Sequence, residues 1–116
     1  RDAKRNATIF LNYEKYNQWD EVWDMLHSDS QDLWADRQMF VQTMNNPSSN
    51  LVRFKLEKPE TLPSWSLPGS GNSYSNVVEI PVFLVYSTTN GKLERYQMIH
   101  TVKVDGRWQF FQFPAR

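Results

Sequence analysis

His100 is the residue in the sheet-forming part of the chain that is best suited to chemistry. An imidazole changes its charge near neutral pH and can serve as a general acid or base. His100 lies in a stretch rich in β-branched residues, and other polar side chains at apolar-flanked positions could join it in one cavity. We predict a ligand-binding cavity lined by Tyr13, Tyr16, Tyr96, His100 and Gln112.

Catalysis by His100 would require a second group. A catalytic histidine is normally oriented by a carboxylate, and none of the positions that we assign below to the inner sheet face is Asp or Glu. We therefore assign no catalytic residue. A buried histidine that hydrogen-bonds to one tyrosine is the alternative to a ligand-contacting one.

Metal, thiol and nucleic-acid chemistry are not favoured. Asp29, Asp32 and Asp36 are spaced by three and four residues, but they match no calcium loop, and Asp36 is a good helix N-cap. The chain has no cysteine, and its 13 basic and 13 acidic residues cancel, whereas nucleic-acid binding requires a basic surface. We predict no metal, no cofactor and no nucleic-acid partner. We also expect no membrane insertion by this segment, since no apolar run approaches the required length of about 20 residues.

The elements that must position these residues are helices followed by a sheet. Apolar residues recur at helical spacing in residues 2–17, where Ile9, Phe10, Tyr13 and Tyr16 form one stripe. Residues 51–58 alternate as a half-buried strand, and residues 77–113 contain two hairpins. We predict one α+β domain over residues 1–116, with helices at about 2–45 and an antiparallel sheet at about 51–113.

The register of the two hairpins decides which side chains share a face. Turns at Asn90-Gly91 and Asp105-Gly106 allow two-residue or three-residue loops. The three-residue choice keeps one face more apolar, and it pairs Ile80 with His100. That choice places the following residues on the inner face: Val78, Ile80, Val82, Leu84, Tyr96, Met98, His100, Val102, Trp108, Phe110 and Gln112.

The outer face in this register is unusually apolar. Its members are Pro81, Phe83, Ile99, Phe111 and Phe113. A solvated sheet face normally alternates to polar residues, and large exposed apolar patches mark interfaces. We predict that this face contacts another protein domain or a second copy of the chain. The alternative is that the last strand twists and both faces are buried against the helices.

One long connection, residues 59–76, carries the aromatic residue Trp65. Connections of this length without regular structure are often functional. Part of the segment could instead extend the flanking strands, with a tip at residues 68–72. Trp65 is then either a lid or partner anchor, or a side chain that caps the core.

The order of these elements resembles the nuclear-transport-factor-two-like superfamily. The resemblance rests on the Trp19-to-Leu26 segment WDEVWDML, on DRQMF at residues 36–40 and on VDGRW at residues 104–108. It implies a strongly bent antiparallel sheet that wraps the helices as an α+β cone and leaves a cavity between them.

The superfamily includes both enzymes and binding modules. The resemblance does not choose between them. Because the predicted inner face has no carboxylate, we predict a non-catalytic ligand-binding or protein-interaction module, with a small apolar ligand as one candidate. The alternative is a small isomerase, dehydratase or cyclase that uses His100 and tyrosines in the cone cavity. Because the chain starts at Arg1 and resembles extracytoplasmic bacterial members, we expect a piece of a larger protein at the bacterial cell surface or outside the cell.

Overall fold

The computed structural model describes residues 2–115 and begins with four helices. These are α1 (Asp2–Lys15), α2 (Trp19–Asp24), α3 (Ser28–Gln31) and α4 (Arg37–Met44). Asp36 caps α4 as predicted, because its carboxylate accepts a hydrogen bond from the Met39 amide at 2.8 Å. The His27 imidazole caps α3 by accepting from the Asp29 amide at 3.0 Å.

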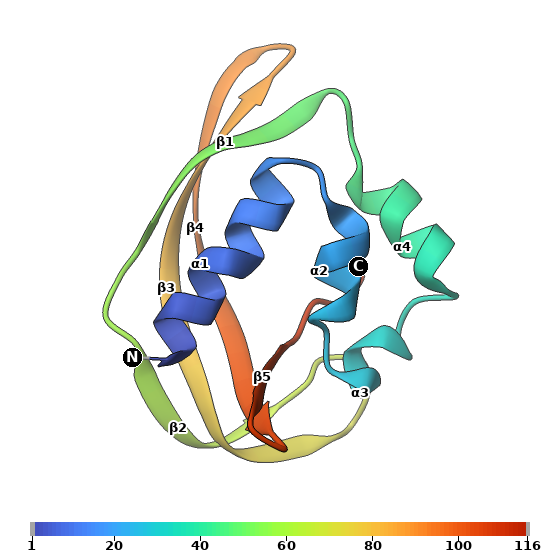
Figure 1. The fold of residues 1–116 in the computed structure, drawn as a ribbon. Coiled ribbons are helices and arrows are strands. Elements are labelled where there is room, and N and C mark those ends of the chain that lie inside the picture. Colours follow the sequence, from blue (N-terminus) through green and yellow to red (C-terminus); the bar gives the residue numbers. More distant parts are fainter. Residues whose placement is uncertain (1, 116) are drawn as a thin grey trace.

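Five antiparallel strands follow the helices. They are β1 (Ser49–Leu56), β2 (Glu60–Ser66), β3 (Ser73–Thr88), β4 (Gly91–Val104) and β5 (Arg107–Phe110). Their order is β1-β3-β4-β5, and β2 pairs with the first part of β3. Figure 1 shows the sheet curling around α1 without closing into a barrel. The predicted α+β class with helices before an antiparallel sheet is confirmed.

The core lies between α1, α2, α4 and the concave side of the sheet. The Phe10 ring of α1 stacks on the Phe110 ring of β5, with centroids 4.5 Å apart. The Phe40 ring of α4 lies within 6.2 Å of three tryptophan rings, which belong to Trp19, Trp23 and Trp34. Large aromatic side chains bury much area each, so the first contact joins α1 to the sheet and the second joins α4 to α2 and the segment before α4.

The buried stripe of α1 differs from the predicted one. Ala3, Ala7, Phe10 and Leu11 are buried, whereas Ile9 and Tyr16 are exposed. The prediction is confirmed at Phe10, and Tyr13 packs against the core, but it was wrong at Ile9 and Tyr16 because it gave weight to large apolar residues and ignored alanines. Small alanine side chains let the helix approach its neighbours closely, so the stripe is rotated toward Ala3 and Ala7.

The predicted register of both hairpins is wrong by one residue. In the structure Thr88 pairs with Gly91, which leaves Thr89-Asn90 as the loop and places Ile80 opposite Ile99. The Thr88 hydroxyl closes this turn: it accepts from the Asn90 amide at 3.2 Å and donates to the Gly91 carbonyl at 2.6 Å.

The second hairpin also has a two-residue loop, which is Asp105-Gly106 between Val104 and Arg107. Both loop residues have positive φ, 50° and 79°, as a type I′ turn requires. A one-residue slip turns a strand over. Thr101, Ile99, Gln97 and Arg95 of β4 therefore lie across from the predicted inner residues of β3, in place of Val102, His100, Met98 and Tyr96.

The long connection is largely regular structure. β2 and the first part of β3 form a hairpin in which Trp65 pairs with Tyr74, and residues 67–72 make its tip. The expectation that this segment extends the flanking strands is confirmed. The tip reaches the helices, since the Tyr74 hydroxyl donates a 2.5 Å hydrogen bond to the Asp29 carboxylate of α3.

Candidate functional site

A pocket of about 330 Å³ lies between the helices and the part of β4 that has no second strand partner. We call it the α1–β4 pocket. β5 covers β4 only from Thr101 to Val104, so the preceding part of β4 is paired with β3 alone among the described strands. The residues that line the pocket come from α1, α4, β3, β4, the segment before α4 and the C-terminal tail: Phe10, Leu11, Glu14, Trp34, Thr43, Met44, Leu84, Tyr86, Arg95, Gln97, Met98, Ile99, His100, Phe111, Gln112, Phe113 and Ala115.

Glu14 is the carboxylate of this pocket. It follows Phe10 and Leu11 by four and three residues, so the α-helical repeat brings it onto the buried side of α1. Burial removes water from the carboxylate and raises the pKa of Glu14 from 4.5 to about 7. The group therefore changes its charge near neutral pH, which an exposed glutamate does not.

Two further titratable side chains face Glu14 from the sheet. Tyr86 of β3 is half-buried, and burial followed by the charge of Glu14 raises the pKa of its phenol to about 12. The Arg95 guanidinium acts on the same phenol in the opposite direction. Arg95 reaches the pocket because it lies opposite the buried Leu84 in the register of β3 and β4.

The last residues of the chain form the remaining wall. The Ser30 hydroxyl, which is fully buried in α3, donates to the Gln112 carbonyl at 2.5 Å and accepts from the Gln112 amide at 2.7 Å. The Trp34 indole donates to the same carbonyl at 3.1 Å. These bonds hold the tail beneath the helices, and so they fix the position of Phe111 and Phe113 in the pocket wall.

The structure brings together only part of the predicted cavity set. His100 and Gln112 line the α1–β4 pocket with Glu14. Tyr13 packs against the core but does not line the pocket, and Tyr16 is 66% exposed. Tyr96 is 69% exposed and pairs with Phe83 on the convex side of the sheet.

His100 has a carboxylate partner that the predicted register did not offer. It pairs with Glu79 across β3 and β4, and the His100 Nε2 and Glu79 Oε2 atoms are 2.8 Å apart. The Trp65 ring stacks on the His100 ring at 4.2 Å, and Trp65 also contacts Phe111 at 4.9 Å. Trp65 therefore covers this imidazole as part of an aromatic cluster.

The five residues predicted for the outer face do not form one surface. Ile99 packs against the core, and Phe111 is buried beside His27 with ring centroids 5.1 Å apart. Phe113 lies in the tail at the pocket. Pro81 and Phe83 remain on the convex side, where they pair with Met98 and Tyr96 respectively.

Sequence reasoning missed Glu14, Tyr86, Arg95 and Gln97. Glu14 could have been found, because it continues the Ala3, Ala7 and Leu11 stripe at helical spacing. The residues of β4 could not be found without the register of the first hairpin. In that hairpin the Thr88 hydroxyl makes two hydrogen bonds across the turn, and an apolar pattern does not reveal these contacts.

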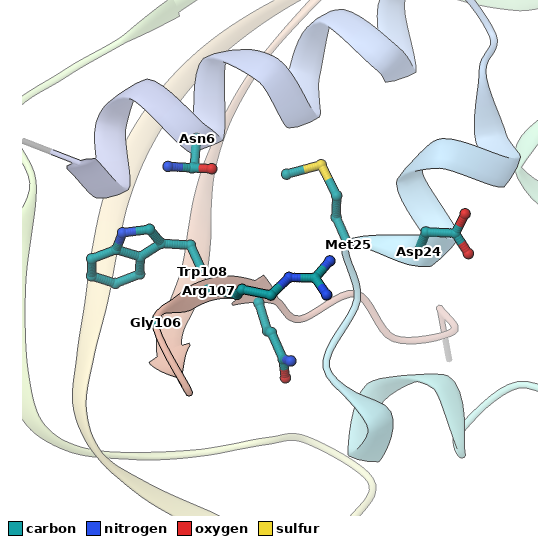
Figure 2. A pocket seen from close by; sticks show the side chains of 7 residues that line it. Asn6, Asp24, Met25, Gly106, Arg107 and Trp108 are labelled. Carbon is teal, nitrogen blue, oxygen red and sulfur yellow. The ribbon is translucent and has the colours of Figure 1, made fainter.

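A second, more polar groove lies at the other end of α1, with a volume of about 280 Å³. Figure 2 shows Asn6 of α1, Asp24 and Met25 at the end of α2, and Arg107 and Trp108 of β5 around it. The Asp24 carboxylate is already engaged, since Arg37 Nη2 lies 2.5 Å from it. This groove lacks the half-buried, partly desolvated carboxylate and the apolar walls of the α1–β4 pocket, so we place the candidate site in the latter.

Residues 2–115 contain no group of three or more His, Asp or Glu side chains arranged to hold a metal ion. Asp29 instead accepts from Tyr74, and Asp36 caps α4. No helix in the described part of the chain has both the length and the apolar character needed to cross a bilayer.

Comparison with known proteins adds no family to these observations. Neither the protein-family models nor the curated proteins searched contain a match to this chain.

Proposed function

We propose that this chain is a non-catalytic binding module whose α1–β4 pocket takes a small, largely apolar ligand. The observation that carries the proposal is the pocket itself. Small-molecule sites are concave, of roughly 300 to 1,000 Å³, mostly apolar, and contain a few convergent polar groups. The α1–β4 pocket has a volume of about 330 Å³, more than half of its lining residues are apolar, and Glu14, Tyr86 and Arg95 converge on it.

The resemblance to the nuclear-transport-factor-two-like superfamily supports the same proposal. Helices that precede a curled antiparallel sheet are the arrangement that the resemblance implies, and the pocket lies between the two layers. On the resemblance alone, we retain the proposal that the module belongs to a larger, extracytoplasmic bacterial protein.

The enzymatic alternative, an isomerase, dehydratase or cyclase based on His100, has less support. Glu79 could orient the imidazole, but Trp65 stacks on its face. Of the tyrosines that this alternative requires, Tyr16 and Tyr96 are mostly exposed and neither lines the pocket.

Protein interaction is a second candidate function, favoured by the convex side of β3 and β4. Two cross-strand pairs there, Pro81 with Met98 and Phe83 with Tyr96, expose apolar surface, and Met98 and Tyr96 are 50% and 69% exposed. If a second copy covers these pairs, light scattering will give a dimer mass that the double substitution Phe83→Thr and Tyr96→Thr, at residues outside the pocket lining, converts to a monomer mass. A monomer at high concentration before substitution argues against self-association.

The pocket proposal is tested by filling the pocket with a side chain. Thr43 of α4 is exposed and lines the pocket, while its neighbour Gln42 is exposed and does not. Calorimetric titration with decanol, a neutral apolar probe, should show binding to the unmodified chain and to Gln42→Trp, and at least tenfold weaker binding to Thr43→Trp. Equal affinity of both variants would contradict the proposal.

A further inference from the structure

Arg95 places one exposed, permanently charged guanidinium at the α1–β4 pocket, and no carboxylate of the described residues 2–115 pairs with it. A guanidinium stays protonated at all physiological pH values. Within residues 2–115, the Arg95 side chain forms no ion pair and donates no hydrogen bond to another residue. Arg37 provides the contrast, because its guanidinium contacts the carboxylates of Asp20 and Asp24 at 3.2 Å and 2.5 Å. The donor fork of Arg95 is therefore available to a ligand.

The pocket's carboxylate carries little negative charge below neutral pH. Glu14 is the pocket's carboxylate, and burial favours its neutral form up to about pH 7. Glu14 and Arg95 form no ion pair with each other. Below neutral pH, the pocket therefore presents one cation and one carboxylic acid that can donate a hydrogen bond.

The rest of the lining suits a hydrocarbon chain. Apolar side chains from α1, α4, β3 and the tail line the pocket together with Arg95, and Leu11, Met44, Leu84 and Phe113 are among them. The volume of about 330 Å³ lies at the small end of the range of roughly 300 to 1,000 Å³ found for small-molecule sites. That size corresponds to a medium-length chain with one polar end.

We propose that the ligand of the α1–β4 pocket is an amphipathic carboxylate, whose anionic end binds Arg95 and whose hydrocarbon chain lies against Leu11, Met44 and Leu84. Arginine binds carboxylates with two parallel hydrogen bonds, which gives both affinity and orientation. The proposal rests on the function proposed above and specifies its ligand class.

Glu14 makes this binding dependent on pH. The titratable and charged groups that line the pocket around it are Tyr86, Arg95 and His100. Neutral Glu14 can donate a hydrogen bond to the bound carboxylate, whereas ionised Glu14 repels it. Because burial raises the pKa of Glu14 to about 7, carboxylate affinity should be higher at pH 6 than at pH 8.

Three probes with the same chain length distinguish the ligand class: decanoate, decanol and decylammonium, each kept below its micelle concentration. Calorimetric titration at pH 6 should give the tightest binding for decanoate. Arg95→Gln should lower the affinity for decanoate about tenfold, because the anion loses a hydrogen bond to a charged group. The same substitution should change the affinity for decanol by less than twofold. Lys92→Gln, also on β4 but outside the pocket lining, should change neither.

A second arm separates Glu14 from His100, because protonation of either one would favour an anion. The decrease in decanoate affinity between pH 6 and pH 8 should disappear in Glu14→Gln and persist in His100→Gln. If decylammonium binds as tightly as decanoate, or if Arg95→Gln leaves decanoate unchanged, the ligand class is wrong while decanol binding still supports the proposed function. If none of the three probes binds, the proposed function itself is overturned.

Discussion

Glu14 and Arg95 line one pocket from α1 and β4 without forming an ion pair with each other. Both charges act on the phenol of Tyr86, with Glu14 raising its pKa and Arg95 lowering it. A half-buried acid and an exposed cation that remain apart leave both groups available to a ligand.

Substituting Glu14 should change how stability depends on pH. The pKa of Glu14 is about 7 in the folded chain and 4.5 in the reference state, so the folded chain retains the proton more strongly. The stability that this provides is fully present below pH 4.5 and is lost as the pH rises through 7. Its size is at most about 3 kcal/mol, and less where solvent reaches the carboxylate.

Glu14→Gln should therefore match the unmodified chain at pH 4.5 and exceed its unfolding free energy at pH 8, in urea melts at both pH values. Glu21→Gln, a substitution at an exposed position of α2, is the control and should show no such divergence. Parallel pH profiles for Glu14→Gln and the unmodified chain would mean that Glu14 is solvated in the folded state.

Loss of the Ser30 hydroxyl should loosen the wall of the pocket. Ser30→Ala removes two hydrogen bonds to the Gln112 backbone, and each such bond contributes about 1 kcal/mol. We expect unfolding free energy to fall by about 2 kcal/mol, and amide exchange to increase in residues 111–115. Ser28→Ala, an exposed substitution in the same helix, should leave both unchanged. Equal exchange in the two variants would show that Ser30 does not hold the tail.

We expect His100 to contribute to folding stability and not to ligand binding. His100→Gln breaks the bond to Glu79, and a hydrogen bond to a charged group contributes about 1.5 to 3 kcal/mol. Unfolding free energy should fall by about 1 to 2 kcal/mol, while decanol affinity stays within twofold. Glu79→Gln should have the same effect. Unchanged stability with lost binding would instead make His100 a ligand contact.

Gly106 should be sensitive because of its backbone conformation. It has φ of 79° in the Asp105-Gly106 turn, and a Cβ atom there would meet no neighbour. Gly106→Ala should therefore cost about 1 kcal/mol through left-handed strain alone. Lys103→Ala lies on the same hairpin outside the turn and provides the control in parallel thermal melts. No loss of stability in Gly106→Ala would contradict the type I′ geometry.

The elements of the fold could be predicted from local signals. Asp36 is a capping residue followed by apolar residues at helical spacing, and Asp105-Gly106 is the preferred pair for a tight hairpin turn. Both signals depend only on residues that are close together in the sequence. The helical span of residues 2–17 and the strand of residues 51–58 followed from periodicity in the same way.

The register of β4 could not be predicted, and the candidate site depended on it. Residues 91–98 are exposed on both faces, so their apolar pattern carries no information about which side faces the helices. The turn is set by the Thr88 hydroxyl. As a result, His100 and Tyr96 were placed on the inner face, and Arg95 and Gln97 were not considered.

The most direct test of the central claim is the location of the bound ligand. In ¹⁵N–¹H correlation spectra of the full chain titrated with decanoate at pH 6, we expect the largest shift changes at Leu11, Glu14, Arg95 and Gln97. The groove at the other end of α1, represented by Asn6, Gly106 and Gln109, should show little change. Shift changes confined to that groove, or none at saturating decanoate, would contradict the assignment of the α1–β4 pocket as the binding site.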